Sequence, residues 1–283
     1  MKIRLVVLGL LITIVSSAQA QVVSNNKTLP IGVFDSGTGG LTVLEAMLRL
    51  DAYNNTTGLP GADGKPDFSS EYFEYLADQA NMPYGNYAAE HKTDLLKEHI
   101  FKNMQYLLQA NNNKSTVKMI VLACNTATAY ALSDIKAKFK AENIQVPVLG
   151  VIDAGAKAAL AYQAKAGSGT IGVFATAGTV ASEGYPRTLQ AMAKEKGLPV
   201  LSVVSQGGAG LAESIDRDWS YFVDTLTQAR KEYKGPSMKN ALYIIDTTLL
   251  SAYKFDKSSN KLLCEYDDKG SCLDLQLNDP ANY

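Results

Sequence analysis

The chain has 283 residues, 46% of them hydrophobic, and its 27 Lys and Arg nearly balance 28 Asp and Glu for a formal net charge of -1. This composition is typical of a soluble globular protein. The balanced charge gives no basic surface for nucleic acid, so nucleic acid is not expected as a partner.

The first 20 residues have the pattern of a secretory signal peptide. Lys2 and Arg4 form a basic start, Leu5 to Val15 form a short apolar run, and Ala18-Gln19-Ala20 offers small residues for cleavage. We expect cleavage after Ala20, no membrane contact afterwards, and a periplasmic or secreted location. A retained membrane anchor is the alternative, but no later segment is apolar for long enough to support it.

Apolar runs alternate with helical patterns along the rest of the chain, which predicts βα units and a largely parallel sheet. The expected strands are Ile31–Asp35, Tyr72–Asp78, Lys118–Cys124, Pro147–Ile152, Thr170–Ala175, Pro199–Val204 and Ala241–Asp246. The expected helices are Gly40–Leu50, Tyr87–Ala110, Thr126–Phe139, Thr179–Glu195 and Leu211–Tyr233. The polar stretch Asn54–Ser70 is rich in Gly, Asn and Asp and is expected to be a surface loop.

An internal echo divides the chain into halves. IGVF at 31–34 returns at 171–174, and CNT at 124–126 has a counterpart, DTT, at 246–248. Such short echoes arise by chance, but here their order and the kind of turn agree as well. We therefore expect an α/β protein of two pseudo-symmetric lobes with the site in the cleft between them. The first lobe would span 30–125 plus about 240–255 and the second 126–239, with a C-terminal hairpin extension at 256–283.

The three cysteines divide into a pair and a single thiol. Cys264 and Cys272 lie in two short strand patterns joined by an Asp- and Gly-rich turn, and an oxidising compartment favours a disulfide between them. Closing so short a loop would stabilise the fold by roughly 2–3 kcal/mol. Cys124 is then the free thiol.

Two strand ends carry groups that would suit an anionic ligand. The segment DSGTGG at 35–40 lies where a strand ends and a helix begins, and the free N–H groups of a helix start attract anions. Its glycine spacing fits neither a phosphate loop nor a dinucleotide-binding loop. A plain helix start capped by Ser36 or Thr38 is the alternative.

Cys124 ends the second of these strands, just before an expected helix. Open α/β sheets bind ligands at this edge. A helix N-terminus also lowers the pKa of a thiol, and the thiolate is the reactive species. A buried structural cysteine is the alternative, but Asn125 and Thr126 beside it favour a carboxylate-binding site.

Four segments, IGVFDSGTGGLTVL, PYG, ACNTATA and IGVFATAGTV, together resemble the ordered motifs of the glutamate racemases, within the wider aspartate/glutamate racemase superfamily. The resemblance runs from about Ile31 to Leu250. It implies two α/β lobes with the active site between them and no cofactor or metal. It also implies two cysteines on opposite faces of the substrate, one of which removes the α-proton while the other returns one.

The resemblance assigns roles to individual residues. Cys124 would be the acid/base on one face, with Asp35 assisting its proton transfers, and Glu213 would be a supporting acid of the second half. Pro83-Tyr84-Gly85 could equally be an ordinary turn and Thr179 an ordinary helix cap. The implied substrate-binding residues are Ser36, Pro83, Tyr84, Gly85, Asn125, Thr126, Thr179, Glu213 and Thr247.

The sequence departs from the family at the second cysteine. Where the family has Gly-Cys-Thr-His, this chain has Ile245-Asp246-Thr247-Thr248. Inversion needs an acid and a base on opposite faces. Asp246 would serve as the second catalytic group if burial raised its pKa. Otherwise Cys124 would act from one face alone.

The expected function is a cofactor-independent racemase-type enzyme that acts on glutamate, aspartate or a related small acidic compound by proton transfer at the α-carbon. One alternative is a one-sided decarboxylase or isomerase of the same superfamily. The other is a non-catalytic exported protein that binds dicarboxylates or amino acids. The sequence leaves open whether the protein is a homodimer.

Overall fold

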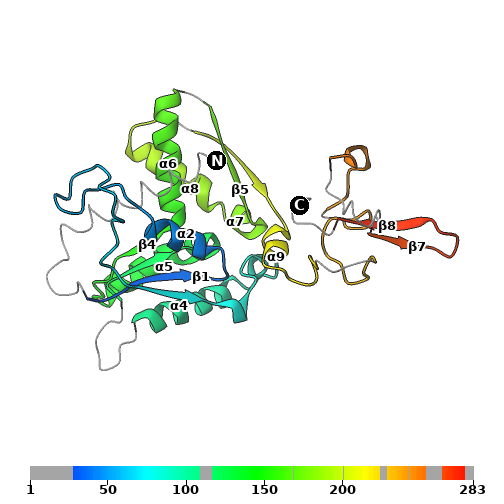
Figure 1. The fold of residues 1–283 in the computed structure, drawn as a ribbon, viewed down its shortest axis with the longest axis horizontal. Helices are drawn as coiled ribbons and strands as arrows, with labels where there is room; N and C mark the ends of the chain where they lie inside the picture. Colours follow the sequence, from blue (N-terminus) through cyan, green and yellow to red (C-terminus); the bar gives the residue numbers. More distant parts are fainter. Residues whose placement is uncertain are drawn as a thin grey trace. The chain divides into compact units, whose positions relative to one another are not determined.

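The computed structural model describes residues 28–108, 117–167, 169–199, 201–223, 228–241, 243–252 and 263–277 (Figure 1). The chain divides into two compact units. The first runs to Val173 and includes Gly178–Ser205, and the second comprises Phe174–Ala177 and the chain from Gln206 onward. The expected signal peptide lies outside the described residues. The predicted lobe boundaries and the pseudo-symmetry of the lobes stay predictions.

The first unit contains a four-stranded sheet in the order β2-β1-β3-β4. The strands are β1 (Ile31–Asp35), β2 (Phe73–Ala77), β3 (Met119–Leu122) and β4 (Val148–Gly150). Each neighbouring pair is parallel, and Val33 lies opposite Tyr75 on one side and Val121 on the other. The α/β class and the parallel sheet are therefore confirmed.

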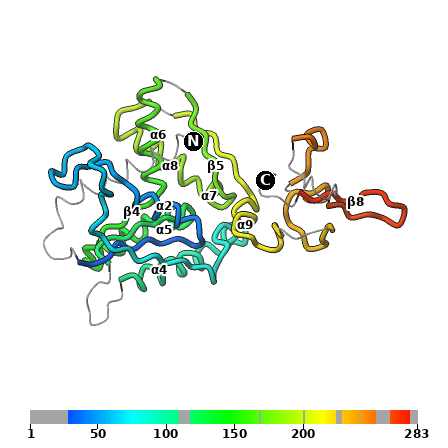
Figure 2. The backbone as a smooth tube through the Cα atoms, viewed as in Figure 1, coloured from blue at the N-terminus to red at the C-terminus, as the bar shows by residue number. Residues whose placement is uncertain are grey.

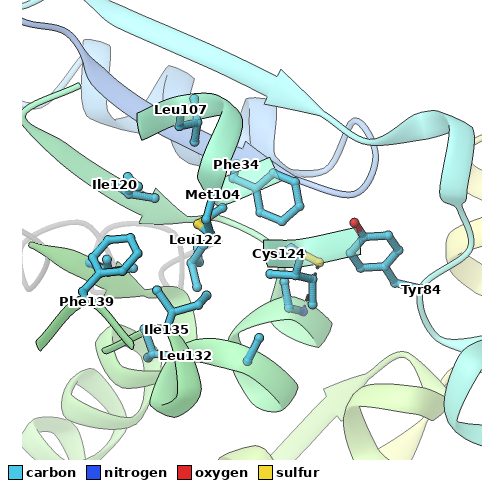
Figure 3. Packing of buried hydrophobic residues seen from close by; sticks show 14 of the residues in the cluster. Phe34, Tyr84, Met104, Leu107, Ile120, Leu122, Cys124, Leu132, Ile135 and Phe139 are labelled. Carbon is cyan, nitrogen blue, oxygen red and sulfur yellow. Dashed lines mark hydrogen bonds between the residues drawn. The ribbon is translucent and has the colours of Figure 1, made fainter. Parts of the chain in front are cut away.

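Helices cover both faces of this sheet. Successive residues of a strand point to opposite faces, and both sets of side chains are buried under helices. Phe34, Ile120 and Leu122 pack with residues of α4 and α5 on one face (Figure 3). Ile31 and Val33 pack on the other face with residues of α2 and the start of α6. The helices of this unit are α2 (Gly40–Leu48), η1 (Gln79–Asn81), α3 (Asn86–Ala89), α4 (Thr93–Leu108), α5 (Asn125–Ala141), α6 (Val151–Ala166), α7 (Ala177–Ala181, which begins in the second unit) and α8 (Gly184–Glu195).

The prediction of a strand over Pro147–Ile152 is wrong at its end. The strand stops at Gly150 and α6 follows immediately, a helix that the sequence analysis did not expect. A Cβ atom at Gly150 would lie 2.4 Å from Cγ2 of Thr128, so only glycine lets the strand end this close to α5. The segment after it is rich in Ala, the residue with the highest helix propensity, which explains why the helix forms.

Two expected helices are interrupted at residues with positive φ. The helix predicted over Tyr87–Ala110 is divided into α3 and α4, and His91 between them has φ 55°. The helix predicted over Thr179–Glu195 is divided into α7 and α8, with Glu183 at φ 53°. Left-handed backbone at a non-glycine residue ends a right-handed helix.

Helices α6 and α8 pack against strands β5 (Thr170–Ala175) and β6 (Ser202–Gly207), which form a two-stranded sheet. β5 has the predicted bounds, and β6 begins three residues later than the predicted strand Pro199–Val204. The loop 54–70 contains no helix or strand and is largely exposed, as expected (Figure 2).

The second unit has little regular structure among its described residues. It contains α9 (Leu211–Ile215), η2 (Thr247–Leu249) and the antiparallel hairpin of β7 (Leu263–Tyr266) and β8 (Cys272–Gln276). The helix predicted over Leu211–Tyr233 is therefore wrong for residues 216–223 and 228–233, the part beyond Ile215 that the structure describes. Arg217 has φ 61°, and the Asp218 carboxylate accepts a hydrogen bond from the Ser220 N–H, so a turn replaces the helix.

The strand predicted over Ala241–Asp246 is also wrong. The described part of this segment makes only an isolated bridge between Ser237 and Ile244. The side chain of Asn240 donates to the carbonyl oxygens of Lys234 and Gly235 and accepts from the Tyr243 N–H. These bonds curl the chain where an extended strand was expected.

The hairpin confirms the predicted disulfide. Cys264 and Cys272 are bonded, with their Cα atoms 5.5 Å apart, and Cys124 is the free, buried cysteine. In the parts of the chain that the structure describes, no helix is long and apolar enough to cross a membrane.

Candidate active site

The loop after β1 is held by Asp35. The Asp35 carboxylate accepts a hydrogen bond from the Gly40 N–H at 2.6 Å, and the Tyr75 hydroxyl donates to the Gly37 carbonyl at 3.0 Å. A Cβ atom at Gly40 would lie 2.6 Å from Cβ of Asp35, so glycine is required where the helix starts. The N-cap residue of α2 is Gly39, so the alternative of a helix capped by Ser36 or Thr38 is not what forms.

Cys124 follows β3 and is the N-cap residue of α5, as the sequence predicted. Its Sγ accepts a hydrogen bond from the Ala127 N–H at 3.4 Å and lies 3.4 Å from the Ser36 hydroxyl. The strands β1 and β3 are neighbours in the sheet, which explains why these two strand ends meet. The thiol is 5% exposed and packs in the same cluster as Phe34 and Tyr84 (Figure 3).

This environment makes the thiol a weak acid. The pKa of Cys124 is raised from 9.0 to about 11, mainly by burial and also by the negative charge of the nearby Asp35 carboxylate, while the hydrogen bonds with Ser36 and Ala127 act in the opposite direction. The expectation that the helix start would give a lowered pKa is therefore wrong, because desolvation outweighs it. At neutral pH the group is a thiol that carries its proton.

Behind the thiol lies a polar cluster, of which only Tyr84 is a site residue predicted from the sequence. The Tyr84 hydroxyl donates to the Asp78 carboxylate at 2.6 Å, and amide groups of Asn103 and Asn81 donate to the same carboxylate at 2.9 and 2.8 Å. Burial and the hydrogen bond to Asp78 raise the pKa of Tyr84. Asp78 follows β2 directly, so its position at the end of the predicted strand Tyr72–Asp78 was the signal that could have identified it.

The Tyr84 side chain is therefore engaged with Asp78, and its exposed fraction is only 2%. It forms part of the wall behind Cys124. Pro83 and Gly85 are partly exposed on either side of it. The backbone of Gly85 lies against α7, since a Cβ atom at Gly178 would be 2.6 Å from Cα of Gly85.

The start of α5 meets α7 and α8 through side chains. The hydroxyl groups of Thr126 and Thr179 lie 3.1 Å apart, and both are buried. Asn125 is exposed, and its side-chain oxygen accepts a 2.7 Å hydrogen bond from the Tyr185 hydroxyl. Tyr185 had not been identified from the sequence; the family-like motif ended before it.

Thus one unit gathers Asp35, Ser36, Cys124, Asn125, Thr126 and Thr179 at the ends of strands and the starts of helices. Glu213, Asp246 and Thr247 belong to the other unit. Glu213 is half-buried in α9, and burial raises the pKa of its carboxyl group.

Asp246 would be a proton donor only if burial raised the pKa of its carboxyl group, and the structure shows the opposite. Its carboxylate is exposed and caps η2 by accepting a hydrogen bond from the Thr248 N–H at 2.9 Å. Hydrogen bonds from the Thr248 hydroxyl and N–H lower the pKa of Asp246. Burial would have raised this pKa, so the condition under which Asp246 would serve as the second catalytic group is not met, and the alternative in which Cys124 acts from one face alone stays open.

Within the described ranges, no group of three or more His, Cys, Asp or Glu side chains is placed to hold a metal ion. The groups around Cys124 are a buried thiol, a nearby carboxylate, and hydroxyl and amide groups on the surrounding helix starts.

Comparison with known proteins identifies the family. The Asp/Glu/Hydantoin racemase family model matches residues 80–231. Glutamate racemases of Streptococcus agalactiae and Levilactobacillus brevis are 37% and 35% identical over 163 and 187 residues, which are 58% and 66% of this chain. The matched parts are only 49% and 55% of those relatives, so the chain spans about half of their length.

A solved structure supports the same relationship. The crystal structure of a glutamate racemase isoform from Bacillus anthracis superposes with a TM-score of 0.51 at 30% identity, over 68% of this chain and 58% of that one. The family model covers more than half of this chain, including Tyr84, Cys124 and Thr179. The chain belongs to the Asp/Glu/Hydantoin racemase family.

Proposed function

We propose that this protein is a cofactor-independent, racemase-type isomerase that moves a proton at the α-carbon of glutamate, aspartate or a related small acidic compound through Cys124. One observation carries the proposal. In a chain of the Asp/Glu/Hydantoin racemase family, the free thiol lies at the carboxyl end of the central β1–β3 strand pair, 3.4 Å from the Ser36 hydroxyl and close to Asp35.

The thiol is prepared to give a proton more readily than to take one. With a pKa of about 11, roughly one group in 10⁴ is ionised at pH 7. As a donor, the S–H group would protonate a carbanion at the α-carbon and become a thiolate. As a base, the thiolate would remove that proton and return to the thiol. A bound ammonium group would favour the thiolate by its positive charge.

The surrounding groups fit a small acidic substrate. Ser36 and Asn125 present a hydroxyl and an amide near the thiol, and the start of α5 favours a carboxylate by its partial positive charge. Relatives named glutamate racemase support glutamate as the first substrate to test.

A second candidate is an enzyme that protonates or deprotonates from one face only, as a decarboxylase or isomerase. The exposure and lowered pKa of Asp246 favour it, because a carboxylate of this kind has no proton to give at neutral pH and is also a weak base for an α-proton. Under this proposal Cys124 alone exchanges the α-proton.

Exchange in heavy water tests both candidates. D- and L-glutamate and D- and L-aspartate are incubated separately with the protein, and deuterium at the α-carbon and inversion are followed by NMR. A racemase exchanges and inverts both enantiomers, whereas a one-sided enzyme labels one enantiomer without inverting it.

Cys124→Ser should slow the exchange by at least about 10²-fold, the lower range for a positioned acid/base group. Lys138→Gln, on the exposed outer side of α5, serves as the control and should react like the unmodified protein. Exchange that survives Cys124→Ser would refute the role of the thiol. Ligand binding without turnover, retained in Cys124→Ala, would identify a non-catalytic binding protein.

We also propose that the protein works in the periplasm or outside the cell. The bond between Cys264 and Cys272 supports this location, because disulfides persist in oxidising compartments. Detection of the protein in a reducing cytoplasmic fraction, with both thiols free, would contradict it.

A further inference from the structure

A second pocket lies apart from Cys124. It has a volume of about 310 Å³, is open to solvent on one side and lies between α5, α6 and α8, within one compact unit. Pockets that hold small ligands begin at about this size. None of the residues assigned above to the thiol site lines it. Its walls are formed by Thr128, Ala129, Leu132, Ser133, Lys136, Ile152, Asp153, Gly184, Arg187 and Thr188.

The charged groups of this pocket favour an anion. Lys136 and Arg187 contribute two positive charges and Asp153 one negative charge. The Lys136 ammonium group lies 3.3 Å from the Asp153 carboxylate, and both side chains are partly exposed. The Arg187 guanidinium has neither an ion pair nor a hydrogen bond with any residue in the described part of the chain. One guanidinium therefore stands at the pocket with its charge uncompensated.

Neutral donors and two helix starts add to this preference. Ser133 and Thr188 supply hydroxyl groups, and Asp153 and Arg187 lie in the first turns of α6 and α8, helices of 16 and 12 residues. The N-terminal turn of a helix carries partial positive charge and unsatisfied N–H groups. The N-cap residue of α6 is Gly150, whose lack of a side chain leaves these N–H groups without a side-chain cap.

We propose that this pocket binds a small molecule through a phosphate or carboxylate group. The guanidinium of Arg187 would hold two oxygens of the anion side by side, the geometry that arginine offers and lysine does not. Lys136 would share its charge between the anion and Asp153. Leu132 and Ile152 form an apolar wall for the uncharged part of the ligand.

Isothermal titration calorimetry tests the site with two probes, inorganic phosphate and succinate, at low ionic strength. Arg187→Gln and Lys136→Gln should each weaken binding by at least about 10-fold, the usual effect of removing a charged hydrogen-bond partner. Asp153→Asn should tighten it, because it removes the negative charge beside Lys136. Lys138→Gln is the matched control: it removes the same charge from α5 but outside the pocket, where Lys138 pairs with Glu142.

The thiol site must be distinguished from this pocket, since it is also expected to bind carboxylates. Alkylation at Cys124 removes any binding at the thiol site, so the alkylated protein should still bind phosphate or succinate, and this remaining binding should depend on Arg187. Loss of binding on alkylation, or equal binding in Arg187→Gln and Lys138→Gln, would overturn the proposal. The probe that binds more tightly identifies phosphate or carboxylate as the preferred group. Heat is measured directly, so the result does not depend on whether the protein turns over any substrate.

Discussion

Two neighbouring side chains should change the acidity of the Cys124 thiol in opposite directions. Asp35 raises the pKa of the thiol by its negative charge, and Ser36 lowers it by hydrogen bonding. Asp35→Asn removes the charge and keeps an oxygen that can accept the hydrogen bond from the Gly40 N–H. We expect this variant to have a more acidic thiol, and Ser36→Ala a less acidic one.

The structure limits the size of both effects. The pKa of Cys124 lies about 2 units above 9.0, and burial is the largest cause, so removal of the Asp35 charge cannot restore the ordinary value. A change of about 0.5–1 unit corresponds to roughly 3–10-fold more thiolate at pH 8. Ser36→Ala loses one hydrogen bond and should reduce the thiolate fraction by a similar factor.

The rate of alkylation by iodoacetamide, followed by mass spectrometry between pH 7 and 11.5, reports the thiolate directly. Cys124 is the free cysteine, so without reductant the label reports this site. The midpoint of the pH profile measures the pKa, and the plateau at high pH measures access to the buried thiol. Far-ultraviolet circular dichroism shows whether the fold persists over this range. A midpoint that rises in Asp35→Asn, or falls in Ser36→Ala, would refute the electrostatic account.

Two further predictions concern stability. Folding raises the pKa of Cys124 from 9.0 to about 11. The protonated thiol therefore contributes to the free energy of unfolding in full below pH 9, and this contribution is lost as the pH rises through 11. The free energy of unfolding should therefore fall by about 2–3 kcal/mol more in the unmodified protein than in Cys124→Ser between pH 8.5 and 11.5, as denaturant titrations would show. Gly178→Ala should cost about 1–3 kcal/mol, because its Cβ would lie 2.6 Å from backbone atoms of Gly85. Gly172→Ala meets nothing within 4 Å and is the control; equal losses in the two variants would contradict the close approach.

The sheet was predictable because its strands are continuous apolar runs. All five residues of β1 and all four of β3 are buried, as parallel strands covered by helices require. Helix α6, which the sequence did not predict, has a different composition. Seven of its 16 residues are Ala, so its buried face is formed largely by small side chains and has no strong apolar period.

The second unit was less predictable because hydrogen bonds between side chains and nearby backbone groups determine its backbone conformation. The apolar pattern over Leu211–Tyr233 fits a helix, but Asp218 and Arg217 form a turn after Ile215. Asn240 bends the chain before the expected strand at Ala241–Asp246. Side chains of Asp and Asn that bind nearby backbone groups compete with regular structure, and a hydrophobic pattern does not record this competition.

Around Cys124 the sequence predicted position better than chemistry. The local pattern predicts that the thiol lies between a strand and a helix; the structure confirms the helix start and ends the strand two residues earlier, at Leu122. The sign of its pKa shift depends on Phe34 and Tyr84, which reach the thiol from distant segments and remove it from water. Tertiary packing of this kind cannot be predicted from the residues next to the cysteine in the sequence.

The direction of the pKa shift bears on the missing second cysteine. In a symmetric site, one thiol and one thiolate could exchange roles with each turnover, and the two directions of inversion would be equivalent. Here the thiol holds its proton at neutral pH, whereas the hydrogen bonds from Thr248 keep Asp246 ionised. We infer that protonation by Cys124 is favoured over abstraction by it. Racemisation therefore requires that a bound substrate lowers the pKa of this thiol, as an ammonium group beside it would, whereas protonation of a carbanion formed by loss of carbon dioxide uses the thiol in the state that it already has.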